Sequence, residues 1–506
     1  MLGLLAATQT FKAPYLDYHA LAPEIVLTAT LMVAIVVDLV TDETRKYLVT
    51  LVTTLGLLAS IVPIFTLAGH GISHTPRVMF DGAYVVDTFA LVLKALLLFS
   101  GFVVMLLSVQ YIEEGDFYEG EYAYLLISSL LGMTIIVSAR DLISIFVALE
   151  LLSIPAYLLA GWRKRDRKSN EAALKYYLLG VLSSGVMVYG MSLVYGFTGQ
   201  TNLYRIADYL RTHGGHAPIV GVAVFFVLIG FCFKISAVPF HLWAPDTYEG
   251  APTPITAFLS VASKTAGFAA ILELVFVAFV HNAKVWHPLF WTLAILTMTI
   301  GNLTALRQTN VVRMLAYSSV AQAGYMLVPL AVARTGSTKI NEPYLTATLT
   351  YLLIYAAMNL GAFAVVIAVS RKTRSGEISS WGGLFTYAPG MATVMGVFMF
   401  SLAGIPPLGG WFAKFVIIRA VFAAGDAWAV ALAVVVAVNS VIALFYYGNV
   451  ARQMFFQAVP EGIDAEPVVV PSSLLAGIGL TSIVTVVSGI APNLLARLGD
   501  LSTLVR

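Results

Sequence analysis

Long apolar runs separated by short polar stretches recur along the chain from residue 23 to residue 495. A helix that crosses about 30 Å of hydrocarbon needs roughly 20 mostly apolar residues, and in lipid every backbone polar group must be satisfied within the segment. We therefore interpret these runs as transmembrane helices and predict about fourteen of them. Their approximate ranges are 23–41, 47–68, 84–111, 122–138, 140–161, 171–198, 218–240, 253–280, 286–306, 311–333, 344–370, 389–424, 427–456 and 471–494.

Three predicted spans depart from a long regular helix. The fourth is short, and only residues 139–141 separate it from the fifth. The seventh contains Pro239, and the twelfth contains the stretch Gly-Ile-Pro-Pro-Leu-Gly-Gly at 404–410, with Pro406 and Pro407. Proline lacks a backbone N–H and clashes with the preceding turn of a helix. We therefore predict broken helices at the seventh and twelfth spans.

The composition supports a membrane protein and excludes several other classes. The chain is 59% hydrophobic and 11% charged, whereas soluble domains have about 45–50% apolar and 25% charged residues. A net charge of +2 gives no field that would attract nucleic acid. The single cysteine, Cys232, excludes disulfides, thiolate metal sites and iron–sulfur ligation. Residues 1–17 lack the features of a removable signal peptide, so we expect the first span to direct insertion.

Basic residues in short loops predict the orientation of the chain. Clusters at 163–168 and 371–374 follow the fifth and eleventh predicted spans. Both loops follow odd-numbered spans and so lie on one side of the membrane, which the rule makes cytoplasmic. We expect both termini on the opposite, outer side.

Five ionisable residues fall inside or beside predicted spans. They are Glu150, Lys175, Lys234, Lys264 and Lys414, in the fifth, sixth, seventh, eighth and twelfth spans. A charge at the bilayer centre costs roughly 2.5–3.5 kcal/mol on insertion scales, and burial disfavours the charged form of such a group. These groups could therefore take up and release protons, and together they predict a proton relay. Any one pair could instead be a static ion pair that fixes helix packing.

Proline follows two of these charges at the same spacing. Pro155 lies five residues after Glu150, and Pro239 lies five residues after Lys234. Because proline deprives the carbonyl four residues earlier of its donor, one carbonyl beside each charge should be free to hold water. His241 adjoins the second of these helix breaks.

Other charged residues receive simpler interpretations. Lys94 lies seven residues after Asp87, so we expect it to pair on that helix or to extend toward the membrane surface. Glu273 is nine residues after Lys264 and near a predicted helix end, which favours a boundary residue.

Several motifs of soluble enzymes are missing from the sequence. It contains no phosphate-binding Gly-x4-Gly-Lys-Ser/Thr, no Gly-x-Gly-x-x-Gly after a strand and no His-Glu-x-x-His. Seven of the eight histidines lie in predicted loops or at span ends, which argues against a haem held by two intramembrane histidines. If the protein serves a redox machine, the electrons travel in other subunits.

The most specific stretch of the chain is 233–264, which includes Trp-Ala-Pro-Asp-x-Tyr-Glu-Gly-Ala-Pro-Thr-Pro at 243–254. It resembles the signature of the antiporter-like subunits of respiratory complex I, the proton-pumping NADH:quinone oxidoreductase. Among these it is similar to the subunit N group, since subunits L and M and the Mrp-type antiporters typically show Trp-Leu-Pro-Asp-Ala-His there. Further matches lie at 23–24, 171–180, 315–319 and 404–411, so the resemblance covers nearly the whole chain.

The resemblance implies an all-α polytopic fold with two inverted five-helix repeats. The first repeat would comprise residues 122–280 with helices 4–8, and the second would comprise residues 281–456 with helices 9–13. Residues 1–121 would form helices 1–3, and residues 457–506 a loop and helix 14. The predicted breaks in helices 7 and 12 would then be corresponding members of the repeats.

The resemblance also implies roles for the five charged residues. Glu150 and Lys175 would form a modulating ion pair, Lys234 would be the central proton carrier, Lys264 a connecting relay and Lys414 the outlet. Subunit M has Glu at the last position, so lysine there also favours subunit N.

One position departs from the family pattern. Gln322 occupies a site where many relatives carry His. Glutamine cannot titrate, so it could act there only through hydrogen bonds and water.

The implied function is proton translocation across the membrane, coupled to quinone reduction elsewhere in the complex. No cofactor is expected in this chain, and NADH, FMN, iron–sulfur clusters and quinone would belong to partner subunits. The partners would be the other membrane subunits of complex I and the lipid bilayer of a bacterial inner membrane, with no nucleic acid. Two alternatives are an Mrp-type cation/proton antiporter, which the form of the 243–254 motif disfavours, and a structural membrane-arm spacer, which the sequence leaves open.

Overall fold

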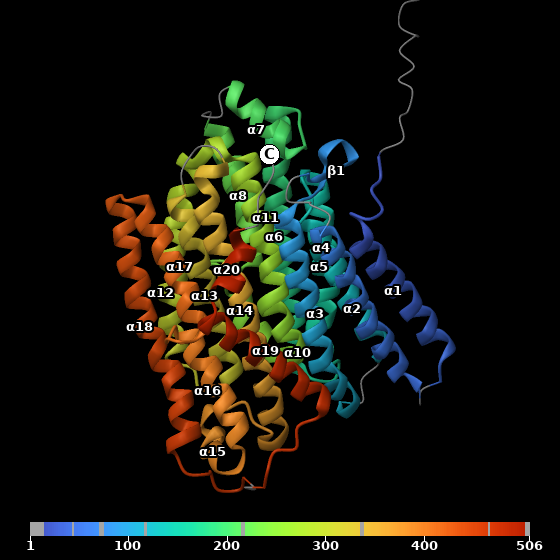
Figure 1. The fold of residues 1–506 in the computed structure, drawn as a ribbon, viewed down its shortest axis with the longest axis vertical. Helices are drawn as coiled ribbons and strands as arrows, with labels where there is room; N and C mark the ends of the chain where they lie inside the picture. Colours follow the sequence, from blue (N-terminus) through green and yellow to red (C-terminus); the bar gives the residue numbers. More distant parts are fainter. Residues whose placement is uncertain are drawn as a thin grey trace, which may run out of the picture.

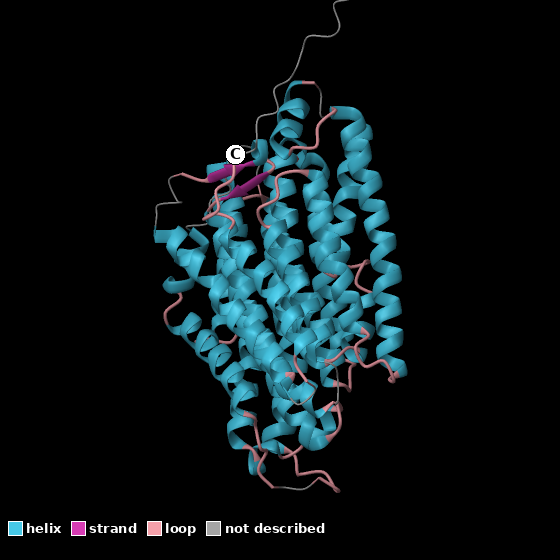
Figure 2. Cartoon of the chain, turned by 90° about the vertical axis from the view of Figure 1, so that its right-hand side faces the viewer, coloured by secondary structure: helices cyan, strands magenta, loops and turns pink. Residues whose placement is uncertain are grey.

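A computed structural model describes residues 15–42, 45–69, 75–115, 119–213, 218–333, 338–463 and 466–500. The helices form an elongated bundle and run mostly along its long axis (Figure 1). Within the described ranges, the only sheet is an antiparallel hairpin of β1 (Arg77–Met79) and β2 (Tyr84–Val86), which lies at one end of the bundle (Figure 2). Both chain termini, which we expect on the outer side of the membrane, fall outside the described residues. So does most of the segment 1–17, which we expect not to be a removable signal peptide.

The helices follow one another along the chain with short connections. The N-terminal part contains α1 (Ala22–Val40), α2 (Tyr47–Gly69), η2 (Phe80–Gly82) and α3 (Thr88–Glu114). The next part contains α4 (Glu119–Ile136), α5 (Leu142–Ala160), α6 (Arg167–Thr198), α7 (Leu203–Thr212), α8 (Pro218–Lys234), α9 (Trp243–Gly250), α10 (Thr253–Phe258), η3 (Leu259–Ser263), α11 (Lys264–Glu273), η4 (Leu274–Ala278) and η5 (Val280–Asn282). The remainder contains α12 (Ala283–Ala305), α13 (Val311–Val332), α14 (Thr338–Thr373), η6 (Ile378–Trp381), α15 (Leu384–Tyr387), α16 (Pro389–Ala403), α17 (Gly409–Ala424), α18 (Ala427–Phe456), α19 (Ser472–Ile490) and α20 (Asn493–Asp500).

Eleven helical stretches in the described part are long and apolar enough to cross a membrane. Three shorter apolar helices, at Gly120–Ile136, Pro218–Lys234 and Pro389–Ala403, coincide with the predicted fourth, seventh and twelfth spans. The prediction of a polytopic and almost entirely helical membrane protein is confirmed. The count of fourteen spans stays a prediction, because these three helices have at most 17 residues each.

Burial separates the central helices from those that face lipid. The most apolar window is 100% buried in the stretch Thr253–Ala278 and 94% buried in α13 and α14, but only 28–33% buried in α1, α2, α6 and α18. The first group therefore forms the centre of the bundle. Polar side chains on these central helices are shielded from both lipid and bulk water, so they must find partners within the protein.

Two helices end well before the predicted spans do. α8 ends at Lys234 rather than at residue 240, and the chain resumes as α9 at Trp243. Ser236 has a φ of +60°, which a continuous helix does not accept. The indole of Trp243 donates to the carbonyl of Phe233 at 3.0 Å and so holds the non-helical segment.

The predicted twelfth span is likewise two helices. α16 ends at Ala403 and α17 begins at Gly409. Gly404 has a φ of +93°, a left-handed conformation that glycine adopts without steric cost. Pro406 and Pro407 lie in the segment between the two helices.

Candidate functional site

Lys234, the last residue of α8, lies in the core with only 3% of its surface exposed. Its ammonium donates to the hydroxyl of Ser153 on α5 at 2.9 Å and to the phenol of Tyr176 on α6 at 3.1 Å. Among the described residues, no carboxylate lies within ion-pair distance of this ammonium. The lysine is therefore held by neutral hydroxyls at the point where the helix ends.

Glu150 on α5 lies near this lysine but is not paired with it. It is partly buried and accepts a hydrogen bond from the hydroxyl of Ser184 on α6 at 2.7 Å. A small cavity lies beside Lys234, and its lining includes the hydroxyls of Ser153, Ser183 and Ser184. Apolar side chains, among them Leu149 and Phe233, form much of the remaining lining.

The expected ion pair between Glu150 and Lys175 is not formed in this structure. Lys175 instead pairs with Glu171 at 2.6 Å and with Asp246 at 2.7 Å, and 42% of its side chain is exposed. The reason is the packing of α9 on α6, which brings Asp246 to Lys175. The carboxylate of Glu150 is occupied by Ser184.

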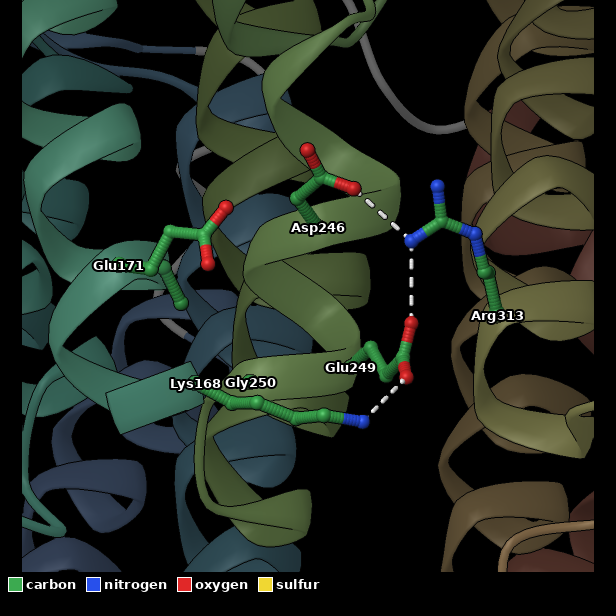
Figure 3. Close-up of a pocket in the computed structure, with 7 residues that line it drawn as sticks. Lys168, Glu171, Asp246, Glu249, Gly250 and Arg313 are labelled. Carbon is green, nitrogen blue, oxygen red and sulfur yellow. Dashed lines mark hydrogen bonds and ion pairs between the residues drawn. The ribbon is translucent and has the colours of Figure 1, made fainter. Parts of the chain in front are cut away.

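Asp246 belongs to a longer chain of alternating charges that joins α6, α9 and α13 (Figure 3). Arg313 on α13 donates to Asp246 at 2.8 Å and to Glu249 at 3.0 Å. Glu249 in turn pairs with Lys168 at 3.1 Å. Burial by itself raises the pKa of the Asp246 carboxyl, but hydrogen bonds from Lys175 and Arg313 outweigh that effect and hold the pKa below its usual value.

Sequence reasoning missed this chain of ion pairs. Asp246 and Glu249 are visible as the acidic positions of the 243–254 motif, but their spacing does not reveal a basic partner on another helix. Arg313, the partner of both, lies 67 and 64 residues away along the chain.

Lys264 lies at the centre of the bundle with 1% of its surface exposed. Its ammonium donates to the backbone carbonyl and to the hydroxyl of Ser319 on α13, both at 2.6 Å. Tyr355 on α14 donates to the same hydroxyl at 2.9 Å. Gly267, one turn after Lys264, faces Lys234, and a Cβ at that position would lie 3.3 Å from the Lys234 side chain. Lys234, at the end of α8, and Lys264, at the start of α11, therefore lie at the same contact between these two helices.

Gln322 on α13 is completely buried and fully engaged in hydrogen bonds. Its amide donates to the carbonyl of Leu402 and to the hydroxyl of Tyr447, both at 3.2 Å, and its carbonyl accepts from Tyr351. The hydroxyls of Tyr447 and Ser318 lie 2.5 Å apart. Gln322, which cannot titrate, thus joins the hydroxyl groups of Tyr351 and Tyr447 in one hydrogen-bonded network.

Lys414 on α17 is 6% exposed and lies beside the interruption between α16 and α17. Its ammonium donates to the carbonyl of Ala403, the last residue of α16, at 2.7 Å. The ammonium also lies 4.8 Å from the centre of the Tyr325 ring, and this ring stacks on Tyr351. Among the described residues, no carboxylate lies within ion-pair distance of Lys264 or Lys414.

Three of the five predicted charged residues are therefore brought to the buried interior. Two separate sets of polar contacts lie between Lys264 and Lys414. Ser319 binds Lys264, and a hydrogen-bonded set of Ser318, Tyr447, Gln322 and Tyr351 reaches Lys414 only through ring contacts of Tyr325. His241, seven residues after Lys234, is buried and has no hydrogen bond to a lysine among the described residues. Pro155 lies within α5.

The interpretations of Lys94 and Glu273 are wrong. Lys94 pairs with Glu24 on α1 at 2.9 Å, rather than with Asp87 on its own helix. Glu273 is completely buried and pairs with Arg140 at 2.5 Å, so it is not a boundary residue. Both partners come from other helices or turns, and the sequence pattern carries no signal for them.

A family model described as NADH:quinone oxidoreductase/Mrp antiporter, transmembrane region, matches residues 139–441. The chain belongs to this family. Within this antiporter-like family, NADH-quinone oxidoreductase subunit N of Trichlorobacter lovleyi is 38% identical over 484 residues, which cover 95% of this chain and 96% of the relative. NAD(P)H-quinone oxidoreductase subunit 2 of Gloeobacter violaceus is 39% identical over 498 residues, which cover 96% and 93% of the two chains.

A solved structure agrees with this assignment. A chain of respiratory complex I from Thermus thermophilus superposes with a TM-score of 0.76 at 28% identity, covering 94% of this chain and 99% of that one. The predicted resemblance to the antiporter-like subunits of complex I is confirmed.

Proposed function

We propose that this chain is subunit N of a proton-translocating NADH:quinone oxidoreductase and that it carries protons on Lys234, Lys264 and Lys414. The observation that carries the proposal is the state of these lysines. Each is at most 6% exposed, each is hydrogen-bonded to neutral groups, and in the described part of the chain none has a carboxylate within ion-pair distance.

Energetics favour proton exchange at such positions. A buried ammonium without a counter-charge loses most of its hydration, so its charged and neutral forms come closer in free energy. Moving one charge against 100 mV needs about 2.3 kcal/mol. That is comparable to one hydrogen bond to a charged group, about 1.5–3 kcal/mol. Small rearrangements of the surrounding hydroxyls are therefore large enough to drive a transfer.

In this proposal the hydroxyl groups between Lys264 and Lys414 form parts of the transfer route, and water would bridge from Ser319 to Ser318 and from Tyr351 to Lys414, where ring contacts or no hydrogen bonds join them. Hydroxyl groups both donate and accept, so they can pass a proton along a chain. Gln322 cannot titrate, and in this proposal it aligns the hydroxyls of Tyr351 and Tyr447 on either side of it.

The proposed control lies in Glu150 and Lys175. In the described arrangement Lys175 is bound to Asp246, and Glu150 lies beside Ser184 near Lys234. Movement of Lys175 away from Asp246 toward Glu150 would change the electrostatic field at Lys234. Redox chemistry elsewhere in the complex would bias this equilibrium.

The finer architecture follows from the same proposal. The chain would contain fourteen transmembrane helices, with inverted five-helix repeats over 122–280 and 281–456 flanked by 1–121 and 457–506. The interruptions after Lys234 and before Lys414 would be corresponding breaks, each placing a lysine beside non-helical backbone. Their supporting prolines are Pro239, Pro406 and Pro407.

Redox cofactors and most partners lie outside this chain in the proposal. NADH, FMN, iron–sulfur clusters and quinone would be bound by partner subunits, and the chain itself would do no redox chemistry. In the described ranges, no group of three or more His, Cys, Asp or Glu side chains could hold a metal ion. The chain would lie in a bacterial inner membrane with both termini outside, in contact with the other membrane subunits.

The test measures protons moved per quinone reduced by the assembled complex in vesicles. The variants are Lys234→Ala and Glu150→Gln, with Lys284→Ala as the matched control because Lys284 is exposed at the start of α12. We expect the first two to assemble with a lower proton-to-quinone ratio and the control to match wild type. An unchanged ratio in assembled Lys234→Ala would overturn the relay and leave a structural spacer.

A further inference from the structure

Three charged side chains other than the proposed relay lysines lie buried together. Arg140, in the turn between α4 and α5, pairs with Asp87 at 3.1 Å and with Glu273 at 2.5 Å. The side chains of these residues are at most 1% exposed. Asp87 directly follows β2, so the cluster lies at the end of the bundle that carries the hairpin (Figure 1).

The charges of this cluster do not balance. Two carboxylates share one guanidinium, which leaves one excess negative charge if both are ionised. The neighbouring pair of Lys94 and Glu24 is neutral by itself and supplies no compensation. The phenols of Tyr84 and Tyr204 also face Glu273, but neither is a cation.

A net charge at this depth is costly. In the described part of the chain, Arg140 is the one basic group within ion-pair distance of Glu273. An isolated buried carboxylate costs several kcal/mol, and such a group commonly binds a proton instead. The cluster is therefore more stable with one proton than with none.

The two carboxylates are not equivalent as proton acceptors. Asp87 caps α3 and accepts the backbone N–H of Ala90 at 2.8 Å, where the helix dipole favours a negative charge. The Oε2 atom of Glu273 is buried and has no hydrogen-bond partner among the described residues. The proton thus belongs on Glu273.

Glu273 also has a notable position relative to Lys264. The two residues are the first and last of α11, about 13 Å apart along the helix axis. π-helical segments, which are frequent at functional sites, lie directly before Lys264 and directly after Glu273. One short helix thus joins a proposed relay lysine at the centre of the bundle to a buried acid nearer its end.

We propose that Glu273 is a further proton-binding site of this chain, and that it exchanges one proton while Arg140 stays charged and Asp87 stays ionised. Loss of the proton from the Glu273 carboxyl changes the cluster from neutral to a net charge of −1, and uptake reverses this. The exchange of this proton during turnover rests on the proposed function, whereas its presence at rest does not.

The first experiment is made without turnover, so it is independent of the pumping test. Infrared difference spectra of the intact complex between mildly acidic and mildly alkaline pH report the carbonyl stretch of protonated carboxyl groups. Glu273→Gln keeps an oxygen that can accept from Arg140 but cannot carry the proton. Glu461→Gln is the matched control, because Glu461 is exposed.

We expect a carbonyl band in wild type and in Glu461→Gln that is lost in Glu273→Gln. A Glu273→Gln spectrum identical to wild type would overturn the proposal. In vesicles, we expect Glu273→Gln to assemble and reduce quinone with a lower proton-to-quinone ratio. If the band is lost but this ratio is unchanged, Glu273 binds a proton at rest and its exchange during turnover is refuted.

Discussion

Gly489 on α19 packs against the non-helical segment between α16 and α17, and its replacement by alanine should displace that segment. A Cβ at this position would lie 1.9 Å from the carbonyl oxygen of Pro407 and 2.5 Å from the carbonyl carbon of Leu408. Ordinary contact begins at 3.4 Å, so the two backbones must separate by about 1.5 Å. No flexible side chain can move aside, because both atoms belong to the backbone.

The expected cost follows from this overlap. Forcing an extra methyl group into a packed site costs about 1–3 kcal/mol, occasionally more. Gly479 lies on the same helix, and a Cβ there would meet nothing within 4 Å. Alanine at that position should be neutral or gain up to about 1 kcal/mol of helix propensity. We therefore expect the two variants to differ by about 1–4 kcal/mol.

The consequence for function arises at Lys414. Its ammonium donates to the carbonyl of Ala403, at the edge of the displaced segment, at 2.7 Å. A shift of that segment by about 1.5 Å would lengthen this hydrogen bond beyond its normal range. We expect Gly489→Ala to lower the proton-to-quinone ratio, whereas Gly479→Ala should retain the wild-type value.

The assay compares both variants with wild type in three measurements. These are the amount of assembled complex, its dissociation temperature in detergent and the proton-to-quinone ratio in vesicles. Equal values for Gly489→Ala and Gly479→Ala in all three would refute the reasoning from backbone contact.

Three further predictions concern polar contacts. Gln322→Leu removes the acceptor of the buried Tyr351 hydroxyl, at about 1–3 kcal/mol, and should slow proton translocation in an assembled complex; wild-type pumping rates would contradict this. Ser184→Ala removes the donor to Glu150 and should lower the pumping rate without loss of assembly, as measured in vesicles against Ser192→Ala. Asp246→Asn should lower the melting temperature. Because the pKa of the wild-type Asp246 carboxyl is lowered in the folded protein, the difference in melting temperature between wild type and variant should stay constant from pH 7 to about pH 5 and shrink only below about pH 4. A gap that closes between pH 7 and pH 5, measured by thermal unfolding in detergent, would show that another group controls it.

The sequence was sufficient for the class of protein and for the depth of the main lysines. In lipid, a long apolar run satisfies its backbone polar groups by forming a helix, so hydropathy alone predicts where the chain crosses the membrane. A lysine within such a run must lie at membrane depth, which is why Lys234, Lys264 and Lys414 could be selected. Proline and glycine indicated where the helix would be interrupted near 404–410, because their effects on the backbone are local.

Only the tertiary structure decided the partners of the charged residues. Lys175 binds Asp246, 71 residues away, and Arg140 binds Glu273, 133 residues away. Spacing along one helix cannot indicate these pairs, because it reports which side chains share a face and not which helix packs against that face. Charges in a membrane interior are stabilised by whatever the neighbouring helix presents, so their pairing is fixed by the packing of the bundle.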